Sequence, residues 1–167
     1  KLIDIKKIKK QHPQIRKKNH KKIDFKKIYK LINKSNKPII IIGNGIHISK
    51  SEKVFIKLAR KLNIPIISSW NASDVIETKD DLYIGRMGIF GERSANLAVE
   101  SSDLLIVLGS RISVPQSGYR KNLFSVKSKK IFVDIDKAEM DSKKFKNIKL
   151  KINSDLNYFI KKALLFF

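Results

Sequence analysis

Residues 103–111 read Asp-Leu-Leu-Ile-Val-Leu-Gly-Ser-Arg, an apolar run that ends on glycine, serine and arginine. Between Leu104 and Leu108 no polar residue alternates with the apolar ones, which predicts a strand covered on both faces, as in a parallel sheet. A loop with glycine at every third position (85–91) and a helix at about 92–101 precede this strand. The unit places backbone N–H groups and a guanidinium at the carboxyl edge of a sheet, a position typical of nucleotide sites.

The same alternation of strand and helix extends along most of the chain. Strands are predicted at 39–42, 64–67, 103–108, 130–134 and 148–152, with helices at 24–33, 50–62, 92–101, 137–142 and after residue 154. Asp24 is the expected N-cap of the first helix, a capping box from Ser49 to Glu52 is expected to begin the second, and Ser154 to cap the last. Such alternation predicts an α/β domain, with a parallel sheet between two layers of helices.

Composition limits the class of protein. The 167 residues suit one domain, and 42% of them are hydrophobic, enough for a core. The chain has no cysteine, which excludes a disulfide framework and a thiolate metal site and fits a reducing cytoplasm, the expected location. No apolar run approaches the roughly 20 residues of a membrane span, and the three histidines do not cluster as metal ligands would. Because the sequence lacks an initial Met and stops abruptly on Phe167, we expect a piece of a longer protein.

The net charge of +22 is concentrated near the start of the chain. Residues 1–37 hold 15 Lys and Arg against Asp4 and Asp24. We interpret 1–22 as a linker from a missing preceding domain and 23–167 as the folded domain. A basic nucleic-acid-binding module is the alternative, but single-strand binders interleave aromatic residues with their positive charge, and this segment has almost none.

Four candidate binding elements each have a plain structural alternative. Gly43-Asn44-Gly45 follows a buried strand and suits either close approach to a phosphate or a tight turn. Arg111 suits either a ligand anion or a surface salt bridge. Asp134 and Asp136 share one side of a strand end, where they can accept from ribose hydroxyls, or Asp136 can cap the next helix. Trp70 at the same edge suits packing or stacking on a ligand.

Six motifs stand in a fixed order along the chain and carry a resemblance to a known family. They are the apolar strand ending on Gly43-Asn44-Gly45, Ile64-Pro65-Ile66-Ile67-Ser68-Ser69, Gly85-x-x-Gly88-x-x-Gly91, Ala95-Asn96-x-Ala98, Asp103-Leu104-Leu105 through Gly109-Ser110-Arg111, and Val133-Asp134-Ile135-Asp136-x-x-Glu139. In this order and spacing, the chain from Asp4 to about Leu165 resembles the central domain of thiamine-diphosphate-dependent enzymes of the acetolactate synthase large-subunit-like family.

The resemblance implies a Rossmann-like three-layer α/β/α domain with a mostly parallel six-stranded sheet, lying between two thiamine-diphosphate domains. It implies FAD in a structural role in the crevice, whereas related members hold ADP or nothing. The positions that correspond to the family's flavin-binding stretches are Gly43, Asn44, Gly45, Ser69, Trp70, Asn71, Met87, Gly88, Ile89, Phe90, Gly109, Ser110, Arg111, Asp134 and Ile135. The activating glutamate and the diphosphate and Mg²⁺ motif belong to the flanking domains, so no catalytic residue and no metal ligand is expected here. The parent would be an oligomeric carboligase or decarboxylase acting on a small 2-oxo acid.

The chain departs from that family in one stretch. After Arg111, acetolactate synthases usually continue with Phe-Asp-Asp-Arg-Val-Thr-Gly, whereas residues 112–119 read Ile-Ser-Val-Pro-Gln-Ser-Gly-Tyr. The second arginine and both acids are absent, and Phe90 stands where histidine is common. This variant is similar to members of amino-sugar and surface-polysaccharide pathways, with ADP or nothing in the crevice.

A sirtuin-like deacylase is disfavoured, because most such enzymes carry a four-cysteine zinc module and this chain has no cysteine.

Overall fold

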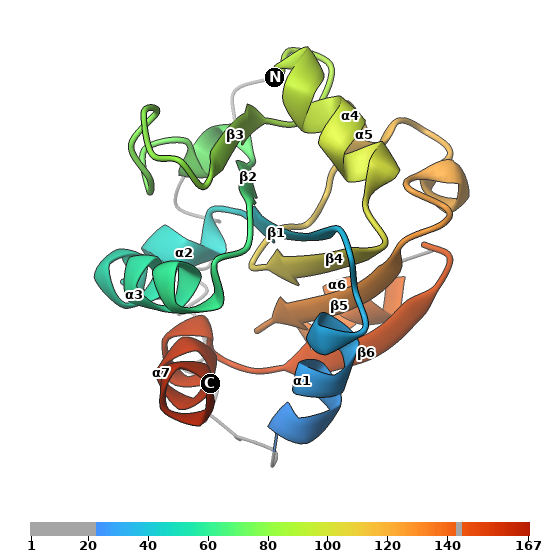
Figure 1. Ribbon diagram of the computed structural model, residues 1–167. Coiled ribbons are helices and arrows are strands. Elements are labelled where there is room, and N and C mark those ends of the chain that lie inside the picture. Colours follow the sequence, from blue (N-terminus) through green and yellow to red (C-terminus); the bar gives the residue numbers. More distant parts are fainter. Residues whose placement is uncertain (1–22, 143–144) are drawn as a thin grey trace, which may run out of the picture.

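The computed structural model describes residues 23–142 and 145–167, and a six-stranded sheet forms its centre (Figure 1). The strands are β1 (Pro38–Ile42), β2 (Ile66–Ser68), β3 (Tyr83–Arg86), β4 (Leu104–Leu108), β5 (Lys129–Asp134) and β6 (Ile148–Asn153). They lie in the order β3-β2-β1-β4-β5-β6, and every neighbouring pair is parallel. The predicted α/β fold class is therefore confirmed. In such a sheet the order reverses between β1 and β4, which leaves a crevice beyond their carboxyl ends.

Helices cover both faces of the sheet (Figure 1). They are α1 (Phe25–Asn33), α2 (Gly45–Ile48), α3 (Glu52–Leu62), α4 (Arg93–Ser101), α5 (Val114–Ser117), α6 (Lys137–Ser142) and α7 (Leu156–Phe166), with 3₁₀ turns η2 (Trp70–Ala72) and η3 (Lys121–Leu123). Helices α1, α3 and α7 pack on one face, where Ile28, Phe55 and Phe159 join the core. Helix α4 packs on the other face through Ala95 and Val99. The three predicted layers are thus present.

Strand β1 shows why the apolar runs form central strands. Ile40 and Ile42 belong to the core on one face, and Ile39 and Ile41 belong to the core on the other. All four are buried, because successive side chains of a strand point to opposite faces and both faces carry helices. The absence of alternation in the sequence is the direct consequence.

Two predicted helix caps are wrong. Ser51, not Ser49, is the N-cap residue of α3. Ser49 instead follows the last residue of an unpredicted short helix, α2, as its C-cap, and its hydroxyl donates to the Gly45 carbonyl (2.7 Å). Helix α7 is capped by Asp155, whose carboxylate accepts from the Tyr158 N–H (3.1 Å), rather than by Ser154. The predicted cap of α1 is confirmed, since Asp24 accepts from the Lys27 N–H (3.1 Å).

Several short elements have no counterpart in the sequence prediction. Strand β3 lies where a glycine loop was expected, and its Gly85 takes a φ of 136°. Helix α5 and turn η3 also went unpredicted. Within residues 23–142 and 145–167, no helix combines the length and apolar character of a membrane span. The predicted linker 1–22, with most of the basic segment behind the nucleic-acid alternative, lies outside the described residues.

Candidate ligand-binding site

A cavity of about 730 Å³ lies at the carboxyl ends of the central strands. The turns after β1, β2, β4 and β5 contribute to its walls, as do α5 and the start of α7. Twelve of the fifteen residues predicted from the sequence line it, namely Gly43, Asn44, Gly45, Ser69, Trp70, Asn71, Met87, Gly109, Ser110, Arg111, Asp134 and Ile135. The fold therefore brings residues from positions 43 to 135 to one crevice, at the point where the strand order reverses.

The loop after β3 supplies the three predicted residues that do not line the cavity. Gly88 takes a φ of 113°, and its backbone N–H donates to the side-chain oxygen of Asn96 (2.8 Å). A Cβ at Gly88 would lie 2.7 Å from the Pro115 carbonyl oxygen, so this glycine allows the loop to pack against α5. Ile89 and Phe90 are each 70% exposed. None of these three residues belongs to the cavity lining.

Phe90 contacts Trp70, which lines the cavity. The two rings lie with centroids 5.1 Å apart and tilted by 45°, and Trp70 is about half exposed. Offset and tilted aromatic pairs of this separation are favourable. Trp70 therefore packs on one side against Phe90 and also lines the cavity, so the packing and stacking interpretations of this residue are compatible.

The floor of the cavity is two backbone turns in direct contact. Gly45 N–H donates to the Gly109 carbonyl (3.1 Å), joining the turn after β1 to the turn after β4. A Cβ on Gly43 would lie 2.4 Å from the Gly109 carbonyl oxygen. Gly109 itself has a φ of 57°, in the left-handed region that favours glycine. The tight-turn interpretation thus accounts for these glycines, and the same close packing keeps the floor free of side chains.

Two of the charged residues that line the cavity, Arg111 and Asp136, form an ion pair. Arg111 is 72% exposed, and its Nη2 lies 3.9 Å from the Asp136 carboxylate. The other Asp136 oxygen accepts from the backbone N–H groups of Ala138 (3.0 Å) and Glu139 (3.3 Å). Both structural alternatives, a surface ion pair for Arg111 and a helix cap for Asp136, are therefore present. Neither contact removes these side chains from the cavity lining.

Asp134 and Asp155 complete the acidic side. The Asp134 carboxylate accepts from the Asp136 N–H (2.9 Å), and Asp155 caps α7. Among the described lining residues, Arg111 is the one cation beside three carboxylates. Carboxylates accept hydrogen bonds only, so this side suits the hydroxyl and amino groups of a ligand, while Arg111 suits one anionic group. In the described part of the chain, no group of three or more His, Asp or Glu side chains is placed to hold a metal ion.

Helix α5 forms a wall that the sequence analysis missed. Ser113, Pro115 and Gln116 line the cavity. A reciprocal capping box holds this helix: the Ser113 side chain accepts from the Gln116 backbone, and Gln116 Oε1 accepts from the Ser113 N–H (2.9 Å). The signal was available, because Ser-x-x-Gln with proline inside the first turn is a helix-start pattern.

Comparison with known proteins assigns this architecture to a family. The sequence model of the thiamine pyrophosphate enzyme central domain matches residues 25–162. The chain belongs to this family. Among curated proteins, a probable acetolactate synthase large subunit of Methanococcus aeolicus is 33% identical over 140 residues, covering 84% of this chain and 23% of the relative. The acetolactate synthase isozyme 2 large subunit of Escherichia coli K12 is 28% identical over 127 residues, 76% of this chain and 23% of the relative.

One further curated relative is not named as an acetolactate synthase. A 3D-(3,5/4)-trihydroxycyclohexane-1,2-dione hydrolase of Geobacillus thermodenitrificans is 33% identical over 84 residues, half of this chain and 13% of the relative. The chain spans less than a quarter of the length of each of these curated relatives. The predicted resemblance to central domains of thiamine-diphosphate enzymes is confirmed.

Proposed function

We propose that this central domain binds an adenine nucleotide, FAD or ADP, in the cavity between the turns after β1 and β4. It would brace two flanking thiamine-diphosphate domains of an acetolactate-synthase-like enzyme. The observation that carries the proposal is that twelve of the fifteen positions that correspond to the family's flavin-binding stretches line a single cavity at the topological switch point. Switch points of open α/β sheets are where such ligands bind.

The size and the lining of the cavity fit such a nucleotide in four ways. Its volume of about 730 Å³ lies within the range of sites for small molecules and cofactors. Trp70 and Ile135 offer apolar surface for a planar ring, and Asp134 offers an acceptor for ribose hydroxyls. Arg111 would contact the diphosphate, together with backbone at the glycine floor. FAD held here would serve a structural role.

The parent reaction would take place outside these residues. We propose a cytoplasmic homo-oligomer that decarboxylates a small 2-oxo acid and either releases the product or joins it to a second carbonyl compound. Thiamine diphosphate, held with Mg²⁺ by the flanking domains, would supply that chemistry. The support is the family membership and the names of the relatives. The part of this domain is to hold the nucleotide and to orient its neighbours.

One observation favours ADP over FAD, and with it an enzyme of amino-sugar or surface-polysaccharide synthesis. The wall after Arg111 is built by the neutral helix α5, where acetolactate synthases usually have two acids and a second arginine. Pro115 and Gln116 of this wall line the cavity. An altered wall beside Arg111 changes the space for the part of the ligand beyond its diphosphate.

The test is to identify the cofactors of the purified polypeptide, in the length in which the cell makes it. Absorbance and fluorescence report flavin, and mass spectrometry of the denatured supernatant distinguishes FAD from ADP. FAD near one per chain supports the acetolactate-synthase-like crevice. ADP supports the alternative, and the absence of any nucleotide, with none taken up on addition, overturns the binding proposal.

A pair of variants localises the site. Arg111→Gln should weaken nucleotide binding about 10-fold or more, because a charge-assisted contact is lost. Arg93→Gln is the matched control, since Arg93 begins α4, is exposed and does not line the cavity. Equal affinities of the two variants would contradict the placement of the diphosphate at Arg111.

A further inference from the structure

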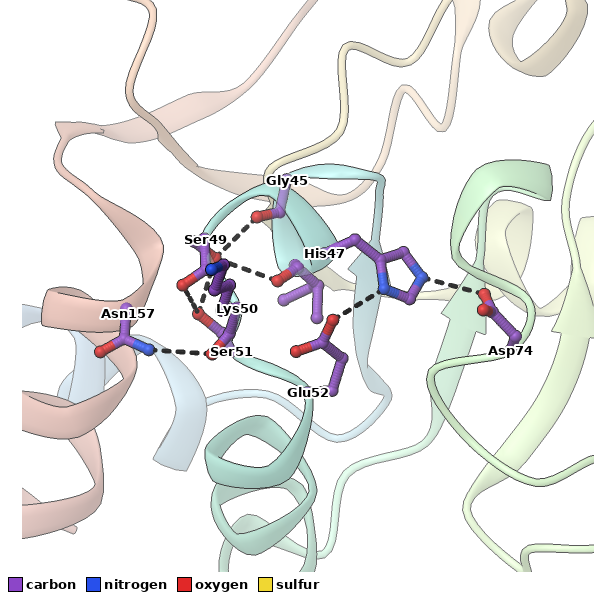
Figure 2. A network of polar contacts seen from close by, with 9 residues as sticks. Gly45, His47, Ser49, Lys50, Ser51, Glu52, Asp74 and Asn157 are labelled. Carbon is purple, nitrogen blue, oxygen red and sulfur yellow. Dashed lines mark hydrogen bonds and ion pairs between the residues drawn. The ribbon is translucent and has the colours of Figure 1, made fainter. Parts of the chain in front are cut away.

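His47 lies between two carboxylates that come from different elements (Figure 2). Its Nδ1 is 2.8 Å from Glu52 Oε1, at the start of α3. Its Nε2 is 2.9 Å from Asp74 Oδ1, which follows η2. Ionised carboxylates only accept hydrogen bonds, and a neutral imidazole carries a single N–H. Both bonds can therefore be made together only when the ring is the doubly protonated imidazolium.

The electrostatics of the network favour that charged form. Hydrogen bonding to Glu52, and next to Asp74, raises the pKa of His47 above its usual 6.5. The hydrogen bond to His47 is the main cause that lowers the pKa of Asp74. The pKa of Glu52 is also lowered, mostly by a hydrogen bond from its own backbone N–H and next by the bond to His47. Among the described residues, these two carboxylates, one on α3 and one after η2, are the charged groups that act on the ring.

Loss of the proton should release one side of the network before the other. The Asp74 side chain is 77% exposed, against 38% for Glu52, so water competes most strongly for Asp74. Glu52 also stays near His47 along the chain, because α2 and α3 are joined by only three residues. Neutral His47 should therefore keep the bond to Glu52 and lose the bond to Asp74.

The two segments joined by His47 both reach the cavity. Gly45 and Ile48, on the same short helix as His47, line it, and so do Trp70 and Asn71, a few residues before Asp74. We propose that His47 is a positioning residue, whose imidazolium ties the turn after β1 to the segment 70–74 and so holds Trp70 and Asn71 in the cavity wall. Deprotonation loosens that wall and weakens ligand binding; this last consequence rests on the proposed nucleotide site.

The test uses this 167-residue chain, because Trp70 is its single tryptophan and its fluorescence reports on the segment 70–74 directly. Between pH 5.5 and 8.5, nuclear magnetic resonance of the ring protons gives the titration of His47. We expect a midpoint above 6.5 and a change in Trp70 fluorescence at that same midpoint. Asp74→Asn should lower the midpoint and abolish the fluorescence change. Glu52→Gln, the matched control, should lower the midpoint but keep the change.

Each result decides the proposal. Trp70 fluorescence that is flat across the titration of His47, in a chain with unchanged far-ultraviolet circular dichroism, overturns it. So does an unaltered fluorescence change in Asp74→Asn. With ADP as the probe, affinity should fall about two- to fivefold above the midpoint, the size expected for one exposed charged contact. ADP that binds at no pH overturns the proposed function, while the fluorescence titration still decides the role of His47.

Discussion

Lys130 allows a test of how burial in this domain changes the pKa of a lysine and, through it, the free energy of unfolding. It lies on β5 with 0% of its surface exposed, and its Nζ donates to the carbonyls of Ser125 (2.7 Å) and Ser128 (2.9 Å). Burial lowers the pKa of Lys130 from 10.5 to about 8, against a smaller opposing effect of the Glu100 carboxylate. The native state therefore releases this proton at a lower pH than the unfolded chain does.

The direction and size of the effect on stability follow from that difference. Between pH 8 and pH 10.5 the unfolded chain holds the proton and the native state does not, so the unfolding free energy rises with pH. At about 1.4 kcal/mol for each pH unit, the fall in the pKa of Lys130 amounts to about 3–4 kcal/mol over this window. Below pH 8 both states are protonated and the contribution is constant.

The assay is urea unfolding of the wild-type chain and of Lys130→Met at several pH values from 7 to 10.5. Other lysines and tyrosines titrate in both chains and cancel in the difference, while the two lost hydrogen bonds destabilise the variant by a constant amount. The unfolding free energy of the wild type should therefore rise by about 3–4 kcal/mol relative to that of Lys130→Met across the range. Lys129→Met removes an exposed lysine at the neighbouring position and serves as the matched control. A constant difference between wild type and Lys130→Met would refute the reasoning.

Three further changes test other parts of the structure. Gly109→Ala should destabilise the domain by about 2 kcal/mol or more in thermal unfolding, because Gly109 has a positive φ and the added methyl group would meet the neighbouring turn at Gly45. Glu92→Gln should flatten the acid limb of the stability curve: hydrogen bonds from Arg86 lower the pKa of Glu92 from 4.5 to about 2, so its contribution is full above pH 4.5 and is lost as pH falls toward 2. Asp103→Ala should cost about 1–3 kcal/mol in urea unfolding, since its carboxylate accepts from three donors in the turn before β1.

The fold was largely predictable because its strongest signals are local. The four isoleucines of β1 and the apolar run of β4 each predict a buried strand from their own residues alone. Glycines directly after these strands mark the turns of the cavity floor. Strand β3 escaped prediction because its four residues include Gly85, and only pairing with β2 makes it a strand.

The helix caps depended on competition among nearby hydrogen-bond partners. Ser49 matches a helix N-cap in sequence, but it follows the short helix α2, and its hydroxyl donates to the Gly45 carbonyl four residues earlier. Glu52, expected in a capping box, instead contacts His47. Local rules rank the possible partners of a polar side chain, and the folded chain decides among them by what it brings within hydrogen-bond distance.

The sequence by itself determined the α/β class, the order of the main elements and the turns that gather at the switch point, because periodicity and glycine placement act over a few residues. The tertiary structure alone decided that Lys130, beside another lysine in sequence, is buried, and that Asp74 meets His47 across 27 positions. Burial and long-range pairing depend on where distant segments come to lie, and the hydrophobic core fixes that arrangement only when the whole chain has folded.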